Sequence, residues 1–494
     1  MKIELWADSF HEGNWCVENL AEIAKKNGYV INRTYQNGFI PTFSFSNSLG
    51  TIELVVYGSY NSWNPVPEKI SNLLQWGKPD FIAYSSEKNK ILFAVEETAA
   101  TPTGNQALQR CERQYGSARL QIPYWYLISE YGVHGDGGVR RDSIWPSISA
   151  IKLSMIKKTP CIVLHYSDID NPENYNSGKG MELLFNSLFV ILENYNFREE
   201  DNNNLLPLLS EQYDEMISFV KNQWSNIIDF LPSESIINSK GLGQEIARLS
   251  FKNNEKSKSS KLKNLLVWPR TDELPENILD QLEGKPLLKY DELANLLEND
   301  LSEKKAYNLS SNSGSGRPPL TSQIDNWIDE QRRIFNNSKF KPDKAKFNLK
   351  LDDFPDTGTN SNRRHLTTAK NIVYLYDYWE DFDKTLVQAF PRLNGLLPVN
   401  DRKSPVFVYL SNSLKPGRIF GDPFTGQISA YSTTFGRFDN PQRLVVAYFP
   451  HQSFGQIDFS SGRRNKGLTI MEELTDYLIF HEGVAVDLKN RKII

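Results

Sequence analysis

Apolar and polar positions alternate along the first two hundred residues in a way that predicts a mixed set of helices and strands. Between Asn14 and Asn27 apolar residues recur every three or four positions, which is typical of a helix with one buried face. A second helix is predicted at residues 104–120. Runs rich in β-branched and aromatic residues predict strands at residues 29–31, 51–57, 80–84, 90–95, 124–128 and 161–165. This order favours a mixed α/β domain.

The rest of the chain divides into two further segments. Residues 201–310 are predicted to form a helical middle segment, because apolar periodicity recurs at 205–231 and 287–301. Residues 308–319 have the Ser, Gly and Pro content of a linker. Residues 311–494 are predicted to form a C-terminal α/β or α+β domain. Its expected features are a helix start at 322–327, strands at 371–376, 406–410 and 443–449, and a turn at 421–426.

Composition narrows the class of protein. With 39% hydrophobic and 12% aromatic residues, the 494-residue chain is too apolar to be disordered overall. It has neither an apolar run of about 20 residues nor a signal-peptide pattern, so we expect a cytoplasmic protein with no membrane partner. The three cysteines are far apart in the sequence, which argues against a disulfide framework and a structural zinc site.

The charge distribution is uneven along the chain, as is typical when one part binds a polyanion. Residues 311–494 hold 25 Lys and Arg against 20 Asp and Glu; of the chain's totals of 56 and 60, this leaves 31 against 40 for the first 310 residues. Basic clusters occur at Arg363–His365 and Arg463–Lys466, and Arg140 and Arg141 follow a glycine-rich loop. Basic groups among aromatic residues suit nucleic acid, although a solvated surface has the same composition.

Two acidic residues fall at the ends of adjacent predicted strands. Asp80 enters the strand at 80–84, and Glu96 ends the strand that begins at Lys90. Because a hairpin places such strand ends side by side, the two carboxylates are predicted neighbours. Neighbouring carboxylates repel each other unless a cation lies between them, and Mg²⁺ prefers oxygen ligands. A bound Mg²⁺ suits phosphodiester hydrolysis, because it stabilises charge on the phosphate and lowers the pKa of a bound water.

The sequence Pro79-Asp80, followed sixteen residues later by Glu96 and then by Thr98, resembles the core motif of the PD-(D/E)xK nucleases. These include many type II restriction endonucleases. The resemblance covers roughly residues 10–170. It implies a central mixed sheet flanked by helices, as in restriction endonucleases, with Asp80 and Glu96 as the two metal-binding acids.

The chain departs from that motif at Thr98, where the family usually has a lysine that orients or activates the attacking water. The predicted helix at 104–120 offers substitutes, because Gln106, Gln109, Arg110 and Arg113 share one face at helical spacing. We expect Thr98 and Gln106 to position the water or phosphate. Arg110 and Arg113 would hold the DNA backbone, with contributions from Arg140 and Arg141.

Some alternatives remain open at the level of sequence. A further metal contact is expected from Glu18 or Glu22 on the N-terminal helix, or from Glu53 on a preceding strand. If Glu97 rather than Glu96 faces Asp80, the lysine position becomes Ala99. Glu96 is preferred because residues two apart on a strand point the same way, which places the polar Thr98 on its face. Pro-Asp is also a common turn, and two glutamates at a strand end are often simply solvated.

The sequence therefore predicts a Mg²⁺-dependent endonuclease that cuts double-stranded DNA, of a restriction or anti-phage defence type. Residues 1–200 would cut, and the two later segments would recognise DNA or mediate assembly. A homodimer is expected, since cutting both strands usually needs two active sites. The alternatives are a non-catalytic DNA-binding or scaffold protein with a degenerate nuclease fold, and a nuclease that acts on RNA or single strands.

Overall fold

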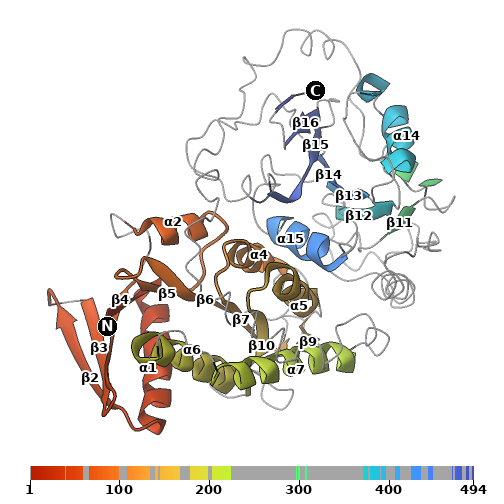
Figure 1. The fold of residues 1–494 in the computed structure, drawn as a ribbon. Helices are drawn as coiled ribbons and strands as arrows, with labels where there is room; N and C mark the ends of the chain where they lie inside the picture. The colour runs from red at the N-terminus through yellow and green to blue at the C-terminus, as the bar shows by residue number, and fades with distance from the viewer. Residues whose placement is uncertain are drawn as a thin grey trace. The chain divides into compact units, whose positions relative to one another are not determined.

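The computed structural model describes residues 2–223, with gaps at 39, 59, 61–65, 99–107, 134–138, 143–144, 167–178 and 199–202. Beyond residue 223 it describes residues 296–297, 299–300, 306–308, 371–376, 379–389, 391–395, 406–411, 424–435, 443–448, 470, 473–480, 485–488 and 492–493. The described residues up to 223 belong to one compact unit, and those from 296 onward belong to a second (Figure 1).

An eight-stranded mixed sheet forms the centre of the first unit, in the order β10-β7-β6-β5-β1-β4-β3-β2. The strands are β1 (Lys2–Ala7), β2 (Val30–Gln36), β3 (Ile40–Asn47), β4 (Gly50–Tyr57), β5 (Phe81–Ser85), β6 (Lys90–Thr98), β7 (Tyr124–Ile128) and β10 (Cys161–His165). Neighbours β1 and β4, β6 and β7, and β7 and β10 run parallel, whereas the other pairs run antiparallel. The predicted mixed α/β architecture is confirmed.

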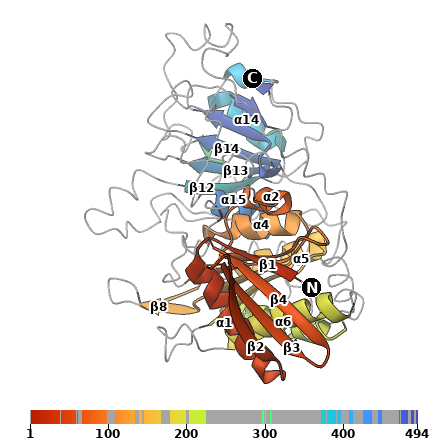
Figure 2. The ribbon, with the colours of Figure 1, turned by 90° about the vertical axis from the view of Figure 1, so that its left-hand side faces the viewer.

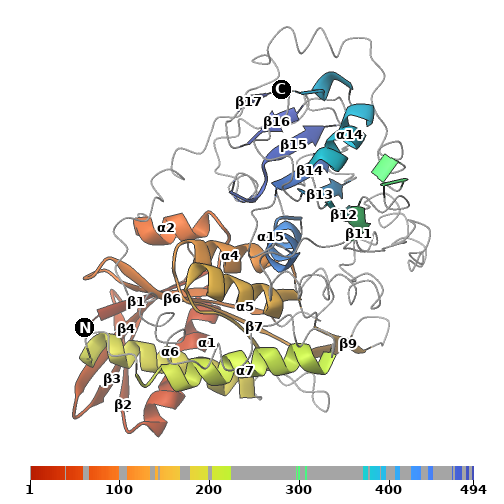
Figure 3. The ribbon, with the colours of Figure 1, turned by 45° about the vertical axis from the view of Figure 1, so that its right-hand side comes forward.

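Helices cover both faces of this sheet (Figures 1 and 3). One face carries α1 (Phe10–Lys26), α6 (Lys179–Phe197) and α7 (Leu206–Gln223), and the other carries α2 (Glu68–Leu74), α4 (Cys111–Arg119) and α5 (Trp145–Lys157). Every residue of β5 and β7 is buried as a result. Strands covered on both faces have continuous apolar sequences, which explains why these two strands were recognisable in the sequence.

Helix α7 belongs to the first unit, which therefore extends beyond residue 200. The Trp125 indole donates to Gln212 Oε1 at 2.7 Å, and the Val163 amide on β10 lies 3.1 Å from Met216 Sδ. Gln212 and Met216 both lie on α7, so this helix packs against the sheet and protects an edge strand that would otherwise expose unpaired backbone groups. Most of the predicted middle segment, including most of the helix at 287–301, lies outside the described residues.

Helix α1 begins at Phe10, four residues before the predicted start. The hydroxyl of Ser9 accepts a hydrogen bond from the Glu12 amide at 3.2 Å and caps the first turn. Ser9 and Glu12 have the spacing of a capping box, a start signal that the apolar periodicity alone does not contain. The extra turn places Glu12 near the end of β1, and this position matters for the site.

Helix α4 is shorter than predicted. Its first helical residue is Cys111, and Arg110 precedes it as the N-terminal cap with φ −109° and ψ 0°. Residues 104–107 of the predicted helix lie outside the described residues. Arg110 therefore lies just before the helix, and Arg113 lies in its first turn, instead of both lying on one face of a long helix.

The second unit contains a seven-stranded mixed sheet in the order β11 to β17. Its strands are β11 (Ala306–Asn308), β12 (Asn371–Tyr376), β13 (Val406–Ser411), β14 (Arg443–Tyr448), β15 (Tyr477–Phe480), β16 (Ala485–Asp487) and β17 (Lys492–Ile493). Helices α14 (Trp379–Ala389) and α15 (Phe424–Phe435) accompany it. The predicted strands β12, β13 and β14 are confirmed. The predicted turn at 421–426 is wrong from Phe424 onward, where α15 begins.

In the described residues of both units, no helix combines the length and hydropathy needed to cross a bilayer.

Candidate active site

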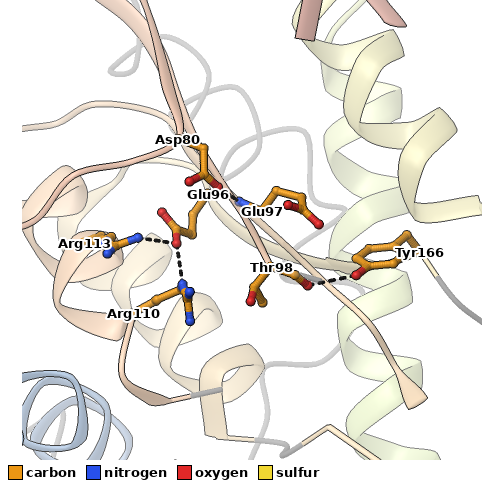
Figure 4. A network of polar contacts seen from close by, with 7 residues as sticks. All are labelled: Asp80, Glu96, Glu97, Thr98, Arg110, Arg113 and Tyr166. Atoms are coloured by element: carbon orange, nitrogen blue, oxygen red, sulfur yellow. Dashed lines mark hydrogen bonds and ion pairs between the residues drawn. The ribbon is translucent and has the colours of Figure 1, made fainter. Parts of the chain in front are cut away.

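The strand register places Asp80 directly opposite Glu96. Phe81 on β5 pairs with Val95 on β6, and the antiparallel register continued by one residue pairs Asp80 with Glu96. Residues directly opposite one another in a sheet point to the same face. The two carboxylates therefore lie on one side of the sheet, at the point where β6 approaches its carboxyl end (Figure 4).

Hydrogen bonds from neighbouring segments hold Asp80 in place. Its carboxylate accepts the Glu97 amide, and its own carbonyl accepts the Asp8 amide at 2.9 Å. The buried Tyr60 hydroxyl donates to the Pro79 carbonyl at 2.8 Å. Because these contacts come from β6, from the end of β1 and from the segment after β4, three parts of the chain together fix this carboxylate beside Glu96.

Two arginines bind the buried carboxylate of Glu96. Arg110 Nε lies 2.5 Å from Glu96 Oε1, and Arg113 Nη1 contacts the same oxygen (Figure 4). Gly77 makes room for Arg113: it has φ +146°, and a Cβ atom there would lie 2.5 Å from Arg113 Cγ. A residue with a side chain would therefore be strained at position 77 and would push the arginine away.

Several buried polar atoms around this contact lack a hydrogen-bond partner. They are Glu96 Oε2, Glu12 Oε2, Arg110 Nη1 and Arg113 Nε. An unsatisfied buried polar group costs about 1–3 kcal/mol, and more when it is charged. Two carboxylate oxygens and two guanidinium nitrogens around this contact therefore have unused hydrogen-bonding capacity.

Asp80, Glu96, Glu97 and Glu12 form an acidic cluster, and burial and repulsion raise the pKa of three of them. Burial and then the nearby Glu96 raise the pKa of Asp80 well above its usual range. The same two causes raise the pKa of Glu97 to about 7. Burial raises the pKa of Glu12, with further contributions from Asp8 and Glu96. Each of these three acids thus ionises less readily than it would in water. A nearby cation would reduce the repulsion between the carboxylates.

The N-terminal helix contributes Glu12 to this cluster, and neither Glu18 nor Glu22. Both of those residues are exposed on other turns of α1. Glu53 is also remote, because it pairs with Lys2 at the start of β1, whereas Asp80 adjoins the end of β1, roughly 16 Å further along the strand. The expectation of a metal contact from Glu18, Glu22 or Glu53 is therefore wrong, and the capping-box spacing of Ser9 and Glu12 was the overlooked signal.

The remaining predicted site residues are placed less completely. Thr98 is buried two residues beyond Glu96, and its carbonyl accepts the Tyr166 hydroxyl at 2.9 Å. Glu97, between them, points away from Glu96 (Figure 4). Gln106 lies outside the described residues, and for Arg140 and Arg141 the structure describes the backbone only.

The chain matches no protein-family model, no curated protein and no solved structure.

A short two-stranded ribbon follows the carboxyl end of β7, on the side of the sheet where β6 also ends. Strands β8 (Tyr131–Val133) and β9 (Val139–Arg141) pair after the end of β7, and Figure 2 shows β8 extending outward. Asp142 closes the base of the ribbon: its amide donates to the Glu130 carbonyl at 2.8 Å, and its buried carboxylate lies 2.9 Å from His165 Nε2. No pattern in the sequence predicted this aspartate–histidine pair, which joins residues 23 positions apart in the chain.

Oxygen donors of the kind Mg²⁺ prefers are present in the cluster. In the described part of the chain, no three His, Cys, Asp or Glu side chains already form a metal-binding group. The available donors are the facing carboxylates of Asp80 and Glu96, of which Glu96 Oε2 is unpartnered; Glu12 Oε2 is a further unpartnered oxygen on α1. Hard divalent cations take carboxylate oxygens together with several waters, so this donor set fits Mg²⁺.

Proposed function

We propose that the protein is a Mg²⁺-dependent endonuclease that hydrolyses phosphodiester bonds of double-stranded DNA, with a PD-(D/E)xK type of active site in its first unit. The observation that carries the proposal is the register that sets Asp80 opposite Glu96, with one buried carboxylate oxygen of Glu96 left without a partner. The raised pKa of Asp80 supports it, because a divalent ion would offset the cost of ionising this carboxyl.

Asp80 and Glu96 would hold the ion, with Glu12 as a further ligand directly or through water. A bound Mg²⁺ would supply a Lewis acid for the phosphate and a lower pKa for the attacking water. The chain itself fixes the carboxylates, because the Glu97 amide and the sheet register orient Asp80 and Glu96 before substrate arrives. Such pre-organisation is the main contribution a protein makes to this reaction.

Arg110 and Arg113 would bind the phosphate, and Thr98 and Gln106 would position the water or the phosphate. A guanidinium group presents several fixed donors that match phosphate oxygens, and each arginine here has a buried nitrogen without a partner. Thr98 stands where the motif has lysine and cannot supply its positive charge. The two arginines are the cationic groups nearest to the acids in the described structure, so they would stabilise the charge of the transition state.

The assembly and biological setting belong to the same proposal. A restriction or anti-phage enzyme needs a recognition element beyond its catalytic core, and the second unit is available for that role or for assembly. Cutting both strands of a duplex favours a homodimer with two such sites.

A non-catalytic DNA-binding or scaffold protein is the second candidate. Thr98 in the lysine position favours it, and so does the occupation of Glu96 Oε1 by both arginines. A nuclease that acts on RNA or single strands would use the same residues as the first candidate and differ in substrate alone.

Incubation of the purified full chain with phage DNA distinguishes these candidates. With Mg²⁺ we expect discrete fragments, which EDTA abolishes. Asp80→Asn should lower the cleavage rate at least about 100-fold, because it removes a metal-binding charge, whereas the matched change Glu18→Gln on exposed helix surface should leave it unchanged. Cleavage of RNA or single strands alone would support the alternative substrate. DNA binding without any cleavage would support the scaffold.

A further inference from the structure

We infer that Arg110 and Arg113 couple the binding of the divalent ion to the binding of a phosphodiester, by holding Glu96 until a phosphate draws them away. The inference rests on the proposed nuclease function and names how that site is regulated. It follows from the ion pairs at Glu96, from the unpartnered nitrogens of both arginines and from the unequal exposure of the three side chains.

The two arginines compete directly with a metal ion for Glu96. Both contact Oε1, so two positive charges are paired with a single carboxylate oxygen. A divalent cation approaching Glu96 Oε2 would be repelled by both guanidinium groups. Like charges this close repel one another, so the pairing must weaken ion binding while it lasts.

The same arginines retain unused hydrogen-bonding capacity. Arg110 Nη1 and Arg113 Nε are buried and have no hydrogen-bond partner. A phosphodiester has two non-bridging oxygens that share one negative charge, and an arginine can donate to both at once. A phosphate would therefore give these groups bonds that Glu96 alone does not supply.

The exposure of the side chains sets the direction of the exchange. The side chains of Arg110 and Arg113 are 21% and 15% exposed, whereas that of Glu96 is 1% exposed. A phosphate arriving from solvent therefore meets the arginine side chains before it meets the carboxylate. When the phosphate pairs with the two guanidinium groups, Glu96 is released from them and can bind the ion together with Asp80.

Coupling of this kind works equally in both directions. If DNA tightens ion binding by some factor, the ion must tighten DNA binding by the same factor. The site would thus bind its ion mainly when a phosphate backbone is present.

Calcium titration of the full chain, with and without sheared duplex DNA, tests the inference. Calcium is the probe because it fits oxygen ligands and, as a poor substitute for Mg²⁺, limits cleavage during the measurement. The heat of calcium binding to the same DNA alone is subtracted. In the wild type we expect DNA to lower the calcium Kd at least about fivefold.

The single variants Arg110→Met and Arg113→Met separate charge exchange from simple ligation of the ion by DNA. Each should bind calcium more tightly than the wild type when DNA is absent, and DNA should then tighten binding by a smaller factor. Arg33→Met, which removes an exposed positive charge from β2, should change neither value. Circular dichroism of each variant verifies that it is folded.

Two results would overturn the inference while the nuclease proposal stands. One is a wild type that cleaves DNA but whose calcium Kd does not depend on DNA, a measurement that needs no variant. The other is weaker calcium binding in a folded arginine variant, which would mean that the arginines merely hold Glu96 in position. A wild type that cleaves no DNA at all would instead remove the proposed function itself.

Discussion

Glu96 has a demanding environment for a carboxylate, because it is buried between an aspartate and two arginines. Its pairing with Asp80 could be predicted from the sequence, since both residues fall at ends of strands that form a hairpin. The arginine contacts to one of its oxygens could not, because they depend on where α4 starts and on the backbone conformation of Gly77. Sequence spacing therefore located the acids but not the charges that oppose them.

Glu12 is the residue that sequence periodicity missed and whose role can be tested directly. Glu12→Gln should weaken Mg²⁺ binding at least about tenfold, because it removes one charge from the cluster while leaving Asp80 and Glu96 in place. The ion concentration that gives half-maximal cleavage measures the effect. Glu18→Gln on the same helix is the matched control, and equal values for the two variants would exclude Glu12 from the site.

Glu97 gives the site a predictable dependence of stability on pH. The folded state holds the Glu97 proton up to a pKa of about 7, whereas the unfolded chain releases it near the ordinary value of 4.5. Folded molecules therefore bind more protons between these values, so this residue's contribution to stability is complete below about pH 4.5 and declines as the pH rises to 7.

Glu97→Gln mimics the protonated form, so its effect should depend on pH. We expect an increase of about 1–3 kcal/mol in the free energy of unfolding at pH 8 and almost none at pH 4.5, measured by urea denaturation. Glu87→Gln on the exposed turn after β5 is the control and should show no such difference. A stabilisation that is the same at both pH values would contradict the raised pKa.

At the scale of secondary-structure elements, the start of α4 packs against the loop before β5 where Arg113 contacts Gly77. This contact sets the position of the arginine beside Glu96. Gly77→Ala should lower the free energy of unfolding by about 2–3 kcal/mol, since alanine is strained at φ +146° and its Cβ would collide with Arg113. It should also reduce cleavage, because the arginine must move.

Gly28→Ala isolates the backbone part of that effect. Gly28 also has a positive φ, of +80°, but an added Cβ there would meet nothing within 4 Å. We expect a loss of about 1 kcal/mol and normal cleavage. If Gly77→Ala were no more destabilising than Gly28→Ala, the close packing of Arg113 against Gly77 would be disproved.

The secondary structure of the first unit was predictable where burial is uniform or periodic. β5, β7 and β10 have continuous apolar sequences, and α1 shows one apolar face. β1 and β3 were not predicted, although Lys2–Ala7 contains the alternation of a half-buried strand. Helix ends were the least predictable feature, because caps such as Ser9 and Arg110 act through local hydrogen bonds and turn geometry.

At the scale of the whole molecule, the sequence predicted that the first unit is a mixed α/β domain. It did not predict the order and direction of the strands in its sheet. β1 lies between β4 and β5, parallel to one and antiparallel to the other, and it thereby brings Asp8 beside Asp80. Such an order depends on contacts between segments far apart in sequence, which periodicity does not contain. The same reason explains why the pairing of Asp142 with His165 was not foreseen.

The most direct test of a shared metal site is calorimetric titration of Mn²⁺ into the wild type, Asp80→Asn, Glu96→Gln and the double variant, without DNA. We predict one ion per chain for the wild type and at least about tenfold weaker binding in each single variant. The double variant should be little weaker than the worse single variant, because residues that hold the same ion act as a unit. Wild-type affinity in the folded Asp80→Asn variant, or no binding by the wild type, would contradict a metal ion held between these two carboxylates.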